Sequence, residues 1–134
     1  MGCRYDWADD SHLIMNLYIE APWTWEEFDS IASSAFPLLR QLGTPCANIV
    51  DVSKIGQLPK GNALMYLTRV ERLMPENVFA SALVGAPYIV SVFMDIIMRT
   101  RPRAGRITFF AKSIPEAHQK IRERHQERYS LPTQ

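Results

Sequence analysis

Residues 13–20 alternate between a fully apolar side and a mixed side, which is the two-residue period of a β-strand covered on one face. The apolar side carries Leu13, Met15, Leu17 and Ile19. Another β-like stretch begins at Cys3, and Asp9, Asp10 and Ser11 separate the two. Because the side chains of these three residues hydrogen-bond nearby backbone, they favour a turn. Residues 3–20 therefore predict a hairpin.

The spacing then changes to three and four residues, which predicts a helix that begins at Thr24. Thr24 and Glu27 form a capping box, and Gly43 with Pro45 marks the end. Pro37 removes one helical hydrogen bond, so we expect a kink or a local 3₁₀ turn there. The predicted buried stripe is Phe28, Ile31, Ala35, Leu38 and Leu42.

The same alternation of strand and helix continues to the end of the chain. Strands are predicted at residues 47–52, 79–86 and 106–111, and helices at 62–74, 88–99 and 114–128. Ser113 and Glu116 form a second capping box. The order ββαβαβαβα predicts an α/β fold, with a mixed, mostly parallel sheet of about five strands and four covering helices.

Composition agrees with one globular domain over residues 1–129, followed by a flexible C-terminal tail at 130–134. The chain has 134 residues, of which 47% are hydrophobic and 22% charged. Its longest apolar run, residues 88–98, is too short for a transmembrane segment, and the N-terminal residues lack the apolar region of a signal peptide. We therefore expect a cytoplasmic protein.

Acidic and basic residues are unevenly distributed, with a net charge of −5 over residues 1–59 and +6 over residues 60–134. A split of this kind can mark a nucleic-acid or acidic-partner surface. In a single folded domain, however, both halves contribute to every face. Nucleic acid is therefore not the expected partner.

No motif for catalysis, a cofactor or a metal is present in the sequence. Phosphate-binding glycine loops and the G-x-S-x-G nucleophile motif are both missing. His12 falls in a predicted strand, while His118 and His125 lie two turns apart on one side of the last helix, too far for one simple metal site. Cys3 and Cys46 form no metal-binding cluster and are interpreted as buried or incidental thiols. We expect a non-enzymatic protein with no cofactor and no metal.

The loops after the parallel strands are the expected place for a ligand or partner, as in other open α/β sheets. The candidate residues there are Trp23, Asp51, Ser53, Lys60, Gly85, Tyr88 and Lys112. Lys60 and Lys112 lie near helix starts, where free amides favour an anion, but solvated lysines beside ordinary caps are the favoured interpretation. Trp23 and Trp25 are either core residues or, for one of them, an exposed interface anchor.

With this element order and the sequence Asp51-Val52-Ser53 at a strand end, the chain resembles the STAS superfamily of anti-sigma-factor antagonist domains, especially its divergent prokaryotic members. The resemblance covers residues 3–126. It implies a role in protein interaction. In phospho-regulated members the following loop carries a Ser or Thr that is phosphorylated, whereas this chain has Lys60 and Gly61 near that position. The fold and the interaction role are therefore expected, but the phosphorylation switch is not.

The helix predicted at residues 88–99 is apolar over more than half of its circumference, which is more than a helix on a sheet needs. We expect the surplus residues Val90, Met94 and Met98 to contact a second subunit, a partner protein or an apolar ligand. The alternative is that the first or the last helix covers them within the monomer.

A run of arginines follows this helix in a predicted loop, and it is a candidate anion site unless the arginines are simply solvated. It consists of Arg99, Arg101, Arg103 and Arg106. The sequence as a whole predicts a STAS-like regulatory or protein-interaction module, with a protein partner and a possible homodimer. The alternative is a carrier or sensor of a small or lipid-like molecule, bound at the loops of residues 51–60 and 85–88.

Overall fold

A computed structural model describes residues 2–129 of the chain, so the tail predicted at 130–134 lies outside the described residues. Strands and helices follow one another along this part of the chain. The elements are β1 (Cys3–Trp7), β2 (Ile14–Ile19), α1 (Trp25–Leu42), β3 (Cys46–Asp51), α2 (Ala63–Leu73), β4 (Val78–Val84), α3 (Tyr88–Thr100), α4 (Pro102–Ile107), β5 (Thr108–Ala111) and α5 (Ile114–Tyr129).

The five strands form one sheet in which they lie side by side in sequence order. β1 pairs antiparallel with β2, which confirms the predicted hairpin, and β2 to β5 are parallel. The predicted fold class, a mixed and mostly parallel α/β sheet, is therefore confirmed. His12, predicted in a strand, lies instead in the hairpin loop with a positive φ of 56°, and its ring stacks on Trp7.

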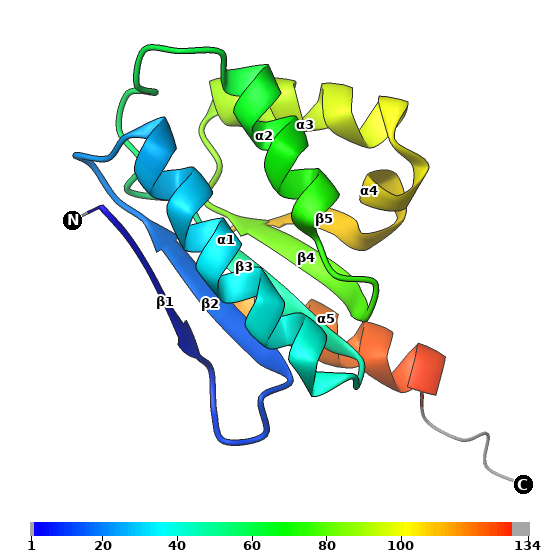
Figure 1. The fold of residues 1–134 in the computed structure, drawn as a ribbon. Helices are drawn as coiled ribbons and strands as arrows, with labels where there is room; N and C mark the ends of the chain where they lie inside the picture. The colour runs from blue at the N-terminus through cyan, green and yellow to red at the C-terminus, as the bar shows by residue number, and fades with distance from the viewer. Residues whose placement is uncertain (1, 130–134) are drawn as a thin grey trace, which may run out of the picture.

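The helices cover the two faces of the sheet unequally. The parallel strands lie next to one another in sequence order. Right-handed crossovers therefore place all the helices that connect these strands on one face of the sheet. Figure 1 shows α1 and α2 in front of the sheet and α5 behind it. Apolar clusters agree: Phe36 of α1 and Ile107 of α4 pack on the front face, Val90 of α3 joins Trp25 and Phe28 there, and Ile121 of α5 packs on the back.

The ends of α1 follow the sequence signals, with one difference in the cap. Thr24 Oγ1 accepts a hydrogen bond from the Glu27 amide at 3.1 Å, and Gly43 ends the helix with a φ of 67°. Glu27 does not return to Thr24; its carboxylate accepts from the Gly2 amide at 3.1 Å. The helix continues through Pro37 without a 3₁₀ segment, so that local turn is not formed. Its buried residues are Trp25, Phe28, Ala32, Ala35, Phe36 and Leu39, a stripe only partly coincident with the predicted one.

Helix α4 is absent from the predicted order, which placed a loop and the start of a strand there. Pro102 ends α3 as expected, but a proline also suits the first position of a helix, and α4 begins at that residue. Ala104 and Ile107 of α4 are buried. This short helix therefore adds two buried apolar side chains to the core before β5 begins at Thr108.

Candidate functional site

The predicted ligand loops meet at the edge of the sheet where the parallel strands end. The amide and hydroxyl of Ser53 both donate to Asp51 Oδ1, at 3.0 and 2.7 Å. Gly85 lies against Ser53, and its amide donates to the carbonyl of Ala111, the residue before Lys112. The structure thus brings Asp51, Ser53 and Gly85 together in a closely packed turn, with Lys112 beside it.

The two lysines of this edge stand beside helix starts that are already capped. Both Lys60 and Lys112 are exposed. At α5, Glu116 Oε2 accepts from the Lys112 amide at 3.0 Å, and this hydrogen bond lowers the pKa of the Glu116 carboxyl. At α2, Asn62 Oδ1 accepts from the Met65 amide at 3.0 Å. The alternative of solvated lysines beside ordinary caps fits this geometry better than an anion site.

Trp23 and Trp25 are both buried, so neither is an exposed interface anchor. Trp23 Nε1 donates to the Ile55 carbonyl at 2.8 Å, and Trp25 Nε1 donates to the Pro59 carbonyl at 3.0 Å. The two indoles therefore fasten the loop between β3 and α2 to the start of α1. Their role is structural, as the core interpretation expects.

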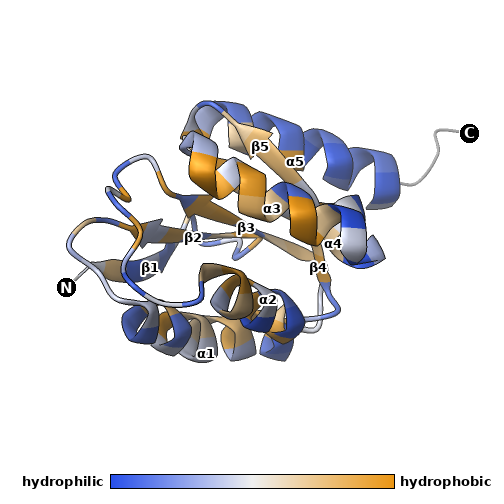
Figure 2. Cartoon of the chain, turned by 90° about the horizontal axis from the view of Figure 1, so that it is seen from above, coloured by the Kyte–Doolittle hydropathy of each residue, from blue (hydrophilic) through white to orange (hydrophobic). Residues whose placement is uncertain are grey.

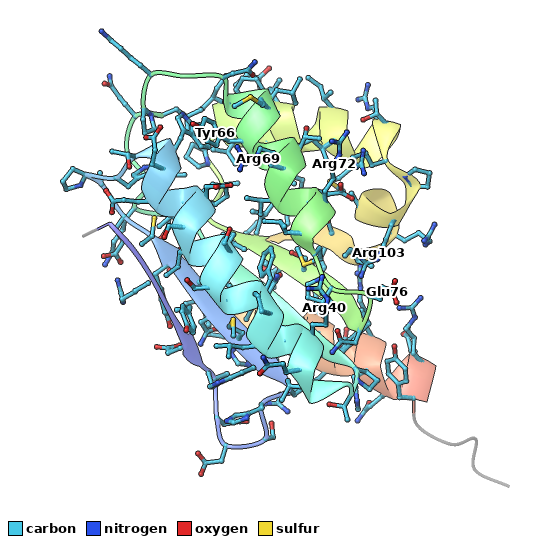
Figure 3. All side chains as sticks on the ribbon, viewed as in Figure 1. Arg40, Tyr66, Arg69, Arg72, Glu76 and Arg103 are labelled. Atoms are coloured by element: carbon cyan, nitrogen blue, oxygen red, sulfur yellow. The ribbon has the colours of Figure 1, made fainter. Side chains whose placement is uncertain are left out.

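The arginine run does not form a common anion site, because three of its members have partners within the chain. Arg99 pairs with Asp95 at 2.6 Å, and Arg101 pairs with Glu71. Arg103, labelled in Figure 3, donates to the carbonyls of Met74, Pro75 and Val78. The prediction of a loop here is wrong for Arg103 and Arg106, which lie in α4. Arg101 and Arg103 instead tie α4 to the end of α2 and the chain that follows it.

The structure contradicts the expected contact of Val90, Met94 and Met98 with a second subunit or a partner protein, because none of the three is exposed. Val90 and Met94 line a cavity, so their contact with an apolar ligand stays a prediction. Val90 is 5% exposed and Met94 packs against the same apolar cluster, while Met98 is partly buried. Residues of α1 and α2 in that cluster cover Val90 and Met94 within the monomer. The sequence predicts one broad apolar arc around this helix but does not tell which part of the arc faces inward.

The exposed apolar residues of α3 lie on the opposite arc. Tyr88 is 83% exposed, Ile89 47% and Ile96 42%. We call these three residues the outer face of α3. Figure 2 shows hydrophobic residues along the length of α3, whereas α5, on the other face of the sheet, is mostly hydrophilic. Asp95 and Arg99 form an exposed ion pair on the same helix.

The two cysteines are unpaired and unsuited to nucleophilic chemistry. Burial raises the pKa of the Cys3 thiol to about 11, with Glu27 adding to the effect. Burial also raises the pKa of the Cys46 thiol to about 11. A catalytic cysteine needs the opposite shift, because the thiolate is the reactive form.

We therefore expect both thiols to react slowly with 5,5′-dithiobis(2-nitrobenzoic acid) near pH 8. Their thiolate fraction is about a hundredfold below that of an ordinary cysteine, so the folded protein should release the chromophore at least that much more slowly than the protein in concentrated guanidinium. Equal rates in both conditions would show that burial does not protect the thiols.

Histidines and acidic residues do not gather into a metal site within residues 2–129. Burial lowers the pKa of the His118 side chain, with the nearby Arg122 acting in the same direction. His125 packs against the rings of Phe79 and Tyr129, which also contact each other. Both histidines of α5 are therefore in contact with other side chains of the chain.

Comparison of the chain with protein-family models, with curated proteins and with solved structures found no significant match. Among the described helices, none combines the length and the apolar composition that crossing a bilayer requires.

Proposed function

We propose that this chain is a cytoplasmic, non-enzymatic regulatory or protein-interaction module that self-associates through the outer face of α3. The observation that carries the proposal is the exposure of Tyr88, Ile89 and Ile96 on one helix. Isolated apolar residues are common on protein surfaces, but a group of them indicates a contact surface. Tyrosine is also among the residues enriched at interaction hot spots.

A second copy of the chain is the partner that the charges of this helix favour. Asp95 and Arg99 stand one turn apart and are both exposed. A twofold dimer presents the same surface twice, so a surface that carries an acid and a base beside apolar residues is complementary to itself. Two copies that meet here cover the isoleucines and place opposite charges at the rim.

The STAS resemblance supports an interaction role and belongs to the same proposal. The strand order from β1 to β5 and the hairpin at the start agree with the element order on which the resemblance rests. Lys60 and Gly61 still leave no hydroxyl near the phospho-acceptor position. The proposed regulation therefore depends on surface contact rather than on phosphorylation. The unpaired thiols suit a reducing compartment.

A carrier or sensor of a small molecule is the second candidate function. The loop after β3 turns three apolar side chains inward. Val52, Ile55 and Leu58 line a cavity on the front face of the sheet. A ligand would therefore lie beneath this loop rather than on its outer surface.

Lysine substitution on the outer face of α3 tests the proposed self-association. Wild type should show twice the monomer mass of 15.4 kDa by light scattering, and the Ile89→Lys/Ile96→Lys variant should show the monomer mass. Because both isoleucines are exposed, the variant is expected to fold, which a melting curve will check. Met65→Lys is the matched control, since Met65 is 43% exposed on α2, and it should remain dimeric. A monomeric wild type at high concentration, or a dimeric double variant, would overturn the proposal.

A further inference from the structure

A cavity lies beneath α2, between this helix and the front face of the sheet. Its volume is about 70 Å³, and a second cavity of about 40 Å³ adjoins it toward Trp25. The two share the walls formed by Phe28, Leu67, Leu83 and Met94. A single water molecule needs only roughly 10–15 Å³, whereas a cavity that binds benzene measures about 150 Å³, so an aromatic ring needs the two cavities to join and to widen.

The space exists because small side chains lie where larger ones would fill it. Ala32 of α1, Ala104 of α4 and Ser81 of β4 all line the larger cavity. Among the residues of α2, Ala63 alone is buried, so most of this helix stands away from the sheet.

Polar contacts hold α2 in place along its flanks rather than from below. Tyr66 and Arg69, labelled in Figure 3, bond to Glu26 and Asp29 of α1 at 3.2 and 3.1 Å. On the other flank Glu71 pairs with Arg101. The two bonds to α1 are exposed and therefore individually weak, whereas the Glu71–Arg101 pair is partly buried.

A row of polar side chains crosses the floor beneath this helix. Asn48, Ser81 and Thr108 are direct neighbours on β3, β4 and β5, and all three are buried. Ser81 and Thr108 line the cavity. Asn48 is fully buried and donates to the sulfur of Met74, which also lines the cavity, at 3.3 Å.

The amide oxygen of Asn48 has no hydrogen-bond partner within residues 2–129. Buried polar atoms are rarely left unpaired, and each exception calls for a partner such as a water molecule or a ligand. Asn48 is the direct neighbour of Ser81, and Thr108 lies one strand further on; Asn48 itself is set back from the cavity, which is lined by its partner Met74 and by the two hydroxyls. A floor with these groups offers one acceptor and two groups that both donate and accept.

We propose that the cavity beneath α2 binds a small, uncharged amphiphile with a hydroxyl group at one end, such as a simple phenol. The hydroxyl exchanges hydrogen bonds with Ser81 or Thr108, which line the cavity, while the ring lies against Phe28, Leu67 and Met94. An uncharged molecule is favoured because Glu71, which lines the cavity, is already paired with Arg101, and an unpaired charge is costly to bury. The inference rests on the second candidate function and is independent of the outer face of α3.

Calorimetric titration with 4-methylphenol and with p-xylene tests the site, since the two probes differ only by a hydroxyl in place of a methyl group. Wild type should bind 4-methylphenol more tightly. The Ser81→Ala/Thr108→Val variant, which removes the hydroxyls with little change in volume, should bind 4-methylphenol about tenfold more weakly and p-xylene no more weakly than wild type.

A second variant, Ala104→Leu, fills the cavity and should abolish binding of both probes, with melting curves to check that each variant folds. Failure of 4-methylphenol to bind at millimolar concentration would mean that the cavity holds water only, which overturns the proposal. Equal affinity for the two probes would overturn the role of the polar row. Either result leaves the light-scattering test of self-association unaffected.

Discussion

Replacing Trp25 with alanine should lower the free energy of unfolding by about 3–5 kcal/mol, a large share of the roughly 5–15 kcal/mol that stabilises a typical domain. Trp25 is 2% exposed. It packs edge to face against Trp23 and Phe28 and stacks on Tyr66 of α2. Its loss leaves a cavity where α1, α2 and the loop after β3 meet.

Trp25→Phe is the matched control for this variant, because it keeps much of the ring and removes the indole N–H. It leaves the Pro59 carbonyl without its hydrogen bond at 3.0 Å, which should cost about 1–2 kcal/mol. Urea unfolding followed by circular dichroism measures both. If Trp25→Ala lowered the free energy of unfolding no more than Trp25→Phe, packing of the indole would not be what stabilises this junction.

Replacing Gly85 with alanine should cost about 2–5 kcal/mol through two separate effects. Gly85 has a φ of 68°, which disfavours a side chain, and an added Cβ would lie 2.6 Å from Ser53 Cβ and 3.0 Å from Ser53 Cα. The Ser53 backbone cannot easily retreat, because its amide is bound to Asp51.

Gly43→Ala separates the two effects. Gly43 has nearly the same φ, 67°, but an added Cβ there meets nothing within 4 Å. It should therefore show only the backbone cost of about 1–2 kcal/mol. Urea unfolding of both variants gives the comparison, and equal losses at the two positions would contradict the close packing of Gly85 on Ser53.

Most of the fold follows from local signals that need no knowledge of tertiary contacts. The turn residues at Asp9 and Ser11, the cap at Thr24 and the ending at Gly43 all act where the sequence places them. Strand and helix periods then fix the element order, and the crossover rule gives the parallel sheet. The exception is α4, where one proline both ends a helix and begins the next.

The candidate surfaces were harder to predict because they depend on how elements are rotated and paired. The period of α3 reveals one broad apolar arc, but only its packing against α1, α2 and the loop after β3 decides that Val90 faces inward and Ile89 outward. The partners of Arg101 and Arg103 lie about thirty residues away in sequence. No local pattern could have paired them.

The polar row escaped sequence analysis for a related reason. Asn48, Ser81 and Thr108 each look like one polar residue in an otherwise apolar strand. They become a row only through the strand register, in which Asn48 stands opposite Ser81 and Ser81 opposite Thr108. With the strand register known, the signal is a buried polar residue at the same position of three neighbouring strands.

Hydrogen exchange of the unmodified protein, measured by mass spectrometry at low and high protein concentration, tests the proposed interface most directly. If two copies meet at the outer face of α3, amides of Tyr88–Thr100 should exchange more slowly at high concentration, since local opening then requires the copies to separate. Peptides of α2, including exposed Met65, should exchange equally at both concentrations. Unchanged exchange in α3, or slowing confined to another element, would contradict the proposal.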